Sequence, residues 1–134
     1  MGGRKLIKDI AYDYYINKDK NCSEAVFLAY NDYYNLGATK EAIKCIGVFG
    51  GGLGCESICG ALSGGAAAIG LKYSNGHAHS SYDMMEKVKS FTGEFQEAFA
   101  SDLCEKIKPV YKQEDIRCWK TVEKACELLE KYMA

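Results

Sequence analysis

The side chains with the greatest capacity for chemistry in this sequence are its seven cysteines. They stand at Cys22, Cys45, Cys55, Cys59, Cys104, Cys118 and Cys126. Two of them, Cys55 and Cys59, belong to a glycine-rich segment, residues 50–64, that runs into an expected helix. A helix start stabilises negative charge and lowers the pKa of a thiol, and the thiolate is the form that binds metal or attacks a disulfide. The segment therefore predicts a reactive or metal-binding thiol, or else a small residue in a tight corner.

The number of cysteines also bears on the compartment. Seven cysteines cannot pair completely within one chain. In a reducing compartment such an excess indicates metal binding or thiol redox chemistry more than a framework of structural disulfides. The sequence after Arg4 and Lys5 has no apolar stretch of signal-peptide length. We therefore expect a cytoplasmic protein, in which any single cysteine can also serve as a small core residue.

Predicted helix starts separate four cysteines from the other three. Cys22, Cys59 and Cys118 fall in or beside expected first turns, where free backbone amides and the helix dipole favour the thiolate. The loop after a long helix that begins near Ser81 can bring Cys104 close to them. Metal ligation and thiol exchange both require acidic thiols, so these four are the predicted functional set.

The short spacings form no strong local motif. Cys55-x-x-x-Cys59 is wider than a Cys-x-x-Cys redox pair, and no second close pair accompanies it to make a zinc ribbon. His77 and His79 lie in a polar segment, where exposure to solvent is the commoner role. The glycine run lacks the Lys-Ser/Thr ending of a phosphate-binding loop and follows no predicted strand, which disfavours nucleotide binding.

The glycines of this segment are expected to support the thiol. They let the backbone turn sharply beside Cys59, and exposed amides there can donate hydrogen bonds to a bound sulfide or thiolate. The predicted cofactor-binding positions are Gly50, Gly51, Gly52 and Gly60.

Composition limits the class of protein. A chain of 134 residues fits one domain, residues 1–134, with a single core. A net charge of -1 with mixed signs argues against a nucleic-acid surface, and the run from Gly60 to Leu71 is too short for the roughly 20 residues of a membrane span. No Ser-His-Asp set or carboxylate pair stands out for hydrolysis. The ten tyrosines can line a cofactor pocket, although rings at the rim of a helical core explain them more simply.

Apolar spacing is helical nearly everywhere and Pro109 is the only proline, so we predict an all-α bundle of about five to six helices. The first helix is expected from Arg4 to Asn17 with a buried stripe that includes Leu6. Asn21, with Glu24 three residues later, is expected to cap a second helix that ends near Gly37. A third, shorter helix is expected to open at Thr39 and to hold Cys45 in the core.

The second half of the sequence predicts three more helices. A helix rich in small residues starts at Cys59 and packs tightly against its neighbours. Ser80 or Ser81 caps a long helix with a buried stripe formed by Val88, Phe91, Phe95 and Phe99. Pro109 is expected in a loop, and Asp115 is expected to cap the last helix, on which Val122, Ala125, Cys126 and Leu129 face inward.

At these residues the chain resembles the C_GCAxxG_C_C family, whose members are described as redox-active, over about residues 21–132. Asn21-Cys22-Ser23-Glu24-Ala25 looks like the family's Asn-Cys start, and Phe49 to Gly54 resembles its Phe-Gly-Gly-Gly-Met-Gly loop. Cys59-Gly60-Ala61-Leu62-Ser63-Gly64 is similar to the core motif, and Cys104 and Cys118 correspond to the remaining cysteines. The resemblance leaves Cys45, Cys55 and Cys126 outside the pattern, with Cys55 as an accessory or resolving thiol.

Three functions fit these residues. The first is a redox protein, an oxidoreductase or electron-transfer component, in which the four cysteines converge on an iron–sulfur cluster for electron transfer or redox sensing. The second is metal-free thiol–disulfide exchange, and the third is a structural zinc or metal-binding module. We expect a redox partner protein and find a homodimer compatible with the exposed tyrosines; nucleic acid and membrane insertion are not expected.

Overall fold

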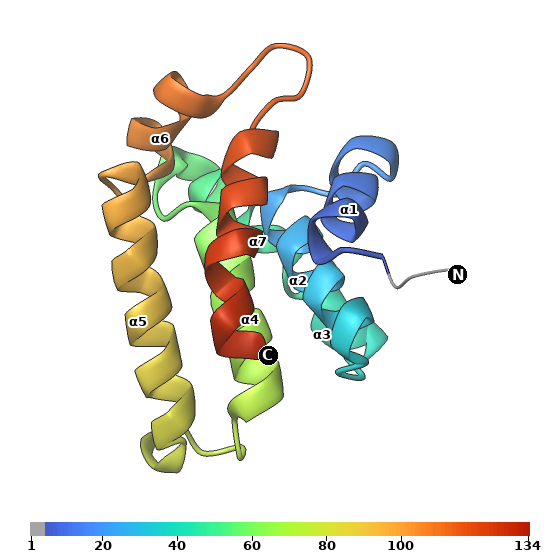
Figure 1. Cartoon of the computed structure of the whole chain (residues 1–134), viewed down its shortest axis with the longest axis vertical. Helices are drawn as coiled ribbons and strands as arrows, with labels where there is room; N and C mark the ends of the chain where they lie inside the picture. The colour runs from blue at the N-terminus through green and yellow to red at the C-terminus, as the bar shows by residue number, and fades with distance from the viewer. Residues whose placement is uncertain (1–4) are drawn as a thin grey trace.

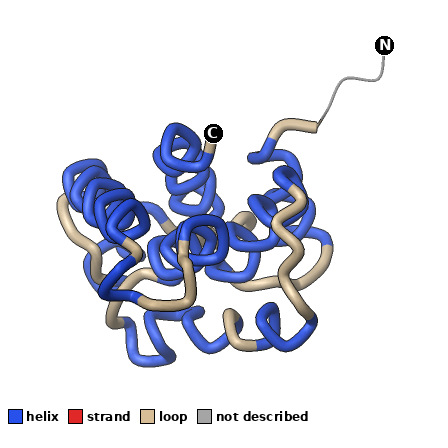
Figure 2. The backbone as a smooth tube through the Cα atoms, turned by 90° about the horizontal axis from the view of Figure 1, so that it is seen from below, coloured by secondary structure: helices blue, strands red, loops and turns tan. Residues whose placement is uncertain are grey.

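The computed structural model describes residues 5–134, so Arg4, where the first helix was predicted to begin, lies outside the described residues. Within that range the chain forms seven α-helices and no strands, which confirms the all-α prediction (Figure 2). The helices are α1 Ile7–Tyr12, α2 Cys22–Tyr34, α3 Lys40–Lys44, α4 Gly60–Tyr73, α5 Tyr82–Phe99, α6 Cys104–Tyr111 and α7 Trp119–Met133.

The helix α4 lies at the centre of the packing. It contacts α2, α5 and α7, while α1 packs against α2 and α7. Figure 1 shows α4, α5 and α7 side by side along the long axis, with α6 across the upper end. The core is therefore built around the one helix whose side chains are mostly small.

Small residues on α4 let its neighbours approach closely, as predicted. A Cβ added at Gly64 would lie 2.8 Å from the Cα of Ser23 on α2, and one at Gly65 would lie 2.7 Å from the Phe91 ring on α5. Such separations are shorter than real contacts allow. Glycine at these positions therefore lets α2 and α5 each pack closely against α4.

The predicted apolar stripes of α5 and α7 face this core. Phe91, Phe95 and Phe99 are buried, and so are the inward positions of α7 that the spacing indicated. Val88 packs partly buried against the same cluster. The buried Tyr30 hydroxyl on α2 donates a hydrogen bond of 2.6 Å to the Cys126 carbonyl, which ties α2 to α7.

The first half of the chain departs from the prediction at two apolar positions. Leu6 was expected to be buried, but it is 58% exposed because the helix begins only at Ile7. After Tyr12 the helix widens into a π-helical turn, Asp13–Asn17. Cys45 was expected in the core, but it is exposed because α3 is a single surface turn that buries none of its residues.

In the second half, three predictions at helix ends were wrong and a fourth, the cap at Ser81, was confirmed only in its position. Pro109 lies inside α6 rather than in a loop, and Cys104 begins this helix rather than following α5 in a loop. Asp115 does not cap α7, because α7 starts later, with Cys118 as its N-cap residue. Ser81 is the N-cap residue of α5, but its hydroxyl bonds to Asn75 and His77 in the preceding loop instead of to the helix amides.

Of the helices in residues 5–134, none combines the length and the apolar character that crossing a membrane requires.

Candidate functional site: a pocket lined by four cysteines

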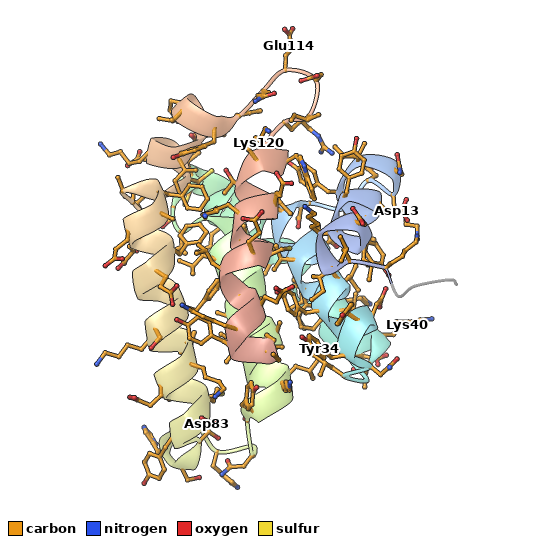
Figure 3. All side chains as sticks on the ribbon, viewed as in Figure 1. Asp13, Tyr34, Lys40, Asp83, Glu114 and Lys120 are labelled. Carbon is orange, nitrogen blue, oxygen red and sulfur yellow. The ribbon has the colours of Figure 1, made fainter. Side chains whose placement is uncertain are left out.

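The starts of four helices surround one pocket of about 180 Å³, and the four predicted cysteines all line it. These are Cys22, Cys59, Cys104 and Cys118. Three of these helices, α4, α6 and α7, begin toward the upper end of the molecule in Figure 1. Figure 3 shows the tip of the loop between α6 and α7 at Glu114, at the opposite end from Asp83 on α5. The fold therefore brings four cysteines that are far apart in the sequence to one end of the molecule.

Each cysteine stands at a helix start. Cys22 and Cys104 are the first residues of α2 and α6, and Cys59 and Cys118 are the N-cap residues of α4 and α7. The helix starts predicted for Cys22 and Cys59 are confirmed, and Cys118 also stands at a helix start, although α7 begins later than predicted. Cys104 joins them because α6 begins where the sequence predicted a loop.

Two backbone hydrogen bonds hold Cys59 beside Cys104. The Cys59 amide donates to the Asp102 carbonyl at 2.8 Å, and the Cys104 amide donates to the Ser57 carbonyl at 2.7 Å. Between them Ile58 and Leu103 form an isolated antiparallel bridge. The start of α4 and the start of α6 are thus joined by their backbones, which holds Cys59 and Cys104 on adjacent segments.

Glycines make room for the sulfur of Cys22. A Cβ at Gly60 would overlap the Cys22 sulfur, so only glycine lets this thiol lie against the start of α4. The Gly51 amide donates a hydrogen bond to the Cys22 thiol. Gly51 and Gly60 therefore line the pocket, while their role in binding a cofactor stays a prediction.

The other two predicted glycines act behind the pocket. A Cβ at Gly50 would overlap the Asn21 side chain, and one at Gly52 would lie 2.9 Å from the Cys104 Cβ. Gly52 also needs its positive φ of 63°. They allow the glycine loop to pack closely behind the thiols without lining the pocket themselves.

The side chain of Tyr15 supports Cys118. The Cys118 amide donates to the Tyr15 hydroxyl at 3.1 Å, and the hydroxyl also hydrogen-bonds the Cys118 thiol. Burial raises the pKa of Tyr15 to about 12, so this hydroxyl stays protonated at neutral pH. The Arg117 guanidinium stacks 4.3 Å from the Tyr15 ring centroid and donates to the Tyr15 carbonyl at 2.6 Å, which fixes the ring.

Three cationic side chains line the same pocket: Lys108, Lys112 and Arg117. Both lysines lower the pKa of the Cys104 and Cys118 thiols. Because opposite charge nearby favours the ionised thiol, the pocket is electrostatically suited to a group with negative charge.

Burial nevertheless controls the ionisation of the four thiols. It is the largest influence on each of them and raises the pKa of all four, to about 12 for Cys59. The sequence argument predicted acidic thiols from helix starts alone, and this was wrong for the metal-free protein. Helix amides do act on Cys59, whose pKa is lowered by the Ala61 and Leu62 amides, but the loss of water outweighs them. A bound metal group would have to displace the thiol protons.

The remaining predicted residues lie away from the pocket. Cys55 is exposed, and its thiol donates to the Gly52 carbonyl at 3.6 Å. His77 and His79 are exposed in the loop before α5, and Cys126 is buried in the core. Across residues 5–134, no three His, Cys, Asp or Glu side chains are arranged around a position for a single metal ion.

Sequence reasoning missed several residues of the pocket. Among them are Lys108, Lys112, Arg117 and Thr121, while Tyr15 was one of ten tyrosines assigned to the rim of the core. A signal for two of them was present, because Lys108 follows Cys104 by four residues and Thr121 follows Cys118 by three. Residues at these separations share a helix face.

These features define a class of protein: an all-helical fold that gathers four cysteines at helix starts around one pocket. The family described as "Putative redox-active protein (C_GCAxxG_C_C)" matches residues 20–132, and the chain belongs to this family. No curated protein and no solved structure matched the chain.

Proposed function

We propose that the protein binds an iron–sulfur cluster through Cys22, Cys59, Cys104 and Cys118, and that it serves electron transfer or redox sensing. The observation that carries this proposal is the convergence of these four thiols on one pocket. Four thiolates are the usual ligand set of such clusters, and their spacing along the chain need not be short.

The size of the pocket favours a group of several atoms over one ion. A structural zinc site is closed, with four sulfurs about 2.3 Å from a single point. The whole pocket that these four thiols help to line measures about 180 Å³. This is about six times the roughly 30 Å³ that one water molecule occupies in the liquid.

The surrounding groups fit a bound unit with negative charge. A cluster held by four thiolates would supply one-electron chemistry, and its potential depends on net charge and on hydrogen bonds to sulfur. The Gly51 amide reaches the Cys22 sulfur and the Tyr15 hydroxyl reaches the Cys118 sulfur. Lys108 and Lys112 add positive charge, so these residues would stabilise the reduced state.

One observation favours a second candidate, thiol–disulfide exchange between Cys22 and Cys59. Gly60 places the Cys22 sulfur against the residue after Cys59, and charge on Cys22 raises the pKa of Cys59. In this reaction one thiolate would attack the disulfide of an oxidised partner protein. The other would then displace the partner, leaving a Cys22–Cys59 disulfide here and two thiols on the partner.

The proposed cellular setting is the reducing cytoplasm. All seven cysteines are free thiols in the structure, which suits the reducing cytoplasm predicted from the sequence. Either function requires a redox partner protein, which we propose docks at the pocket end of the molecule.

The test is anaerobic purification and reconstitution, followed by iron, sulfide and zinc analysis and a visible spectrum. We expect iron and sulfide in the wild-type protein and in Cys45→Ser, whose exposed thiol lies outside the pocket, and their loss in Cys59→Ser. Absence of iron from the wild-type protein, or an unchanged Cys59→Ser, would overturn the cluster proposal. Stoichiometric zinc would favour the metal-binding module. A Cys22–Cys59 disulfide found by mass spectrometry after oxidation of iron-free protein would favour exchange.

A further inference from the structure

Two lysines stand where the cysteine pocket meets the surface of the molecule. Lys108 and Lys112 line the pocket, and both also line a groove of about 400 Å³ outside it. Lys108 follows Cys104 by four residues on α6, so the two residues share a helix face, and Lys112 is the C-cap residue of this helix. We call the two lysines the lysine mouth, because they mark the place where the pocket and the groove meet.

The lysine mouth carries positive charge that carboxylates only partly neutralise. Lys112 is exposed and forms no ion pair with any residue in 5–134. Lys108 is paired at 3.6 Å with Glu56, which lines the groove. Glu114 also lines the groove, but it is exposed and points away from the molecule at the tip of its loop (Figure 3). Since no carboxylate lines the pocket, the mouth attracts negatively charged solutes.

Two of the four thiols lie within reach of these charges. Positive charge on Lys108 and on Lys112 acts to lower the pKa of both Cys104 and Cys118, which places the lysines near both sulfurs. Cys104 is buried, whereas Cys118 is half-buried. Cys118 is therefore the more accessible thiol on the lysine side of the pocket.

We propose that the lysine mouth selects low-molecular-weight disulfides that carry carboxylates, and that Cys118 is the first thiol to react with them. The Cys118 thiol gives its proton to water, and the thiolate attacks one sulfur of the disulfide, which is the oxidant. A bond forms between Cys118 and this sulfur, the disulfide bond breaks, and the other half leaves as a thiolate with the electron pair. This inference goes beyond the proposed function, because it concerns the solutes that reach the thiols of the metal-free protein.

The experiment measures how fast the reduced, metal-free protein reacts with two aromatic disulfides. Dithiobisnitrobenzoate carries a carboxylate on each ring, whereas dithiodipyridine is uncharged. All proteins carry Cys45→Ser and Cys55→Ser, because these two exposed thiols lie outside the pocket and would react with both reagents. The measured quantity is the initial rate with the anionic reagent divided by that with the uncharged reagent. At one fixed pH the thiolate fraction enters both rates alike, so this ratio reports selection by charge.

The variants change the charge of the mouth one lysine at a time. We expect Lys112→Gln to lower the ratio about tenfold at low ionic strength, the lower end of electrostatic steering. Lys108→Gln should also lower it, because this change leaves Glu56 without its cation. Lys112→Arg keeps the charge and should keep the ratio. Lys106→Gln is the matched control, since Lys106 is exposed on the same helix but lines neither the pocket nor the groove.

Salt gives an independent check. At 1 M salt the Debye length is about 3 Å, so the ratio of the double-serine protein should fall toward that of Lys112→Gln.

Each part of the inference has an outcome that overturns it. Equal ratios in the double-serine protein, Lys112→Gln and Lys108→Gln would overturn selection by the mouth, and so would an equally large fall in Lys106→Gln. An unchanged initial rate in Cys118→Ser would overturn the role of Cys118. A protein that takes up no iron would overturn the cluster proposal and leave this inference in place, because the reaction uses metal-free protein.

Discussion

At the scale of single residues, the site depends on the absence of side chains as much as on the four thiols. Gly60 shows this most directly, because the Cys22 sulfur occupies the space that a Cβ at this position would need. Gly70 lies in the same helix and has no atom of another element within 4 Å of its added Cβ. A substitution at Gly70 therefore tests helix propensity alone, whereas a substitution at Gly60 also tests tertiary packing.

Gly60→Ala and Gly70→Ala should change stability in opposite directions. Gly60→Ala should lower the free energy of unfolding by about 1–3 kcal/mol, because either the Cys22 sulfur or the start of α4 must move. Gly70→Ala should raise it by roughly 0.5–1 kcal/mol, because alanine favours the helix at no steric cost. Urea denaturation of the metal-free proteins measures both. Equal effects at the two positions would show that Gly60 is not in close contact with Cys22.

The choice of the four cysteines was accessible to sequence reasoning, but their ionisation was not. Asn21 and Glu24 mark a helix start by their chemistry, so Cys22 could be placed before any coordinates were known. The pKa of a thiol depends on burial, which is set by residues far away in the chain. The Cys59 amide, for example, donates to the Asp102 carbonyl far along the chain, and burial raises the pKa of the Cys59 thiol.

At the scale of elements, the start of α2 joins the thiol site to the glycine loop. The Asn21 Oδ1 accepts from the Glu24 amide at 3.0 Å and from the Ser23 hydroxyl at 2.8 Å. The Asn21 Nδ2 donates to the Gly47 carbonyl at 2.9 Å. One side chain thus completes the capping box and anchors the segment that leads into the loop. Thr39, by contrast, only accepts from the Ala42 amide at 3.0 Å on the surface helix α3.

Removal of these two caps should therefore have unequal effects. Asn21→Ala should lower the free energy of unfolding by about 2 kcal/mol, at the upper end of what a lost N-cap costs, and should reduce cluster uptake. Thr39→Ala should cost about 0.5 kcal/mol and leave cluster uptake unchanged. Chemical denaturation and the iron content after reconstitution are the two measurements. If the two variants lost equal stability and both kept full iron content, the proposed link between the α2 cap and the site would be wrong.

Element boundaries show where local sequence signals stop being sufficient. Proline in a helix interior costs about 3 kcal/mol, which is why a loop was predicted at Pro109. In the structure Pro109 is exposed near the end of α6, while Cys104 and Ile107 on the same helix are buried. Tertiary packing of the buried face thus outweighs the local penalty. Helical spacing likewise cannot show where a helix begins: α1 starts only at Ile7, and Leu6 before it is exposed.

At the scale of the whole molecule, the fold class was predictable and the convergence of helix starts was not. A period of 3.6 residues is a property of each helix by itself, and it correctly indicated an all-α protein. Which ends meet depends on contacts between segments far apart in sequence. The bond from the Cys118 amide to Tyr15 joins residues 103 positions apart, and the bond from Tyr30 to Cys126 spans 96. These contacts depend on side-chain complementarity in three dimensions, for which one sequence offers no periodic signal.

Burial of many phenols and thiols also gives the whole molecule a dependence on pH. Burial raises the pKa of Cys59 and of Tyr15 to about 12, from ordinary values of 9.0 for a thiol and 10.0 for a phenol. It likewise raises the pKa of Tyr30 and of Cys126. Each of these groups stays neutral in the folded state at a pH where it ionises in the unfolded state. Their contribution to stability is therefore complete below pH 9 and is lost as the pH rises toward 12.

The free energy of unfolding of the metal-free protein should consequently decrease in alkali. The free energy of unfolding, measured in urea under reducing conditions, should be constant up to about pH 8 and should fall steadily to about pH 11. Tyr30→Phe provides the control for the phenols. It should be less stable at neutral pH, because the Cys126 carbonyl loses its hydrogen bond, but its stability should fall less steeply above pH 10, because one buried phenol is gone. A free energy of unfolding that did not change between about pH 8 and about pH 11 would mean that water reaches these groups in the folded state, and the burial on which the cysteine pocket depends would then be wrong.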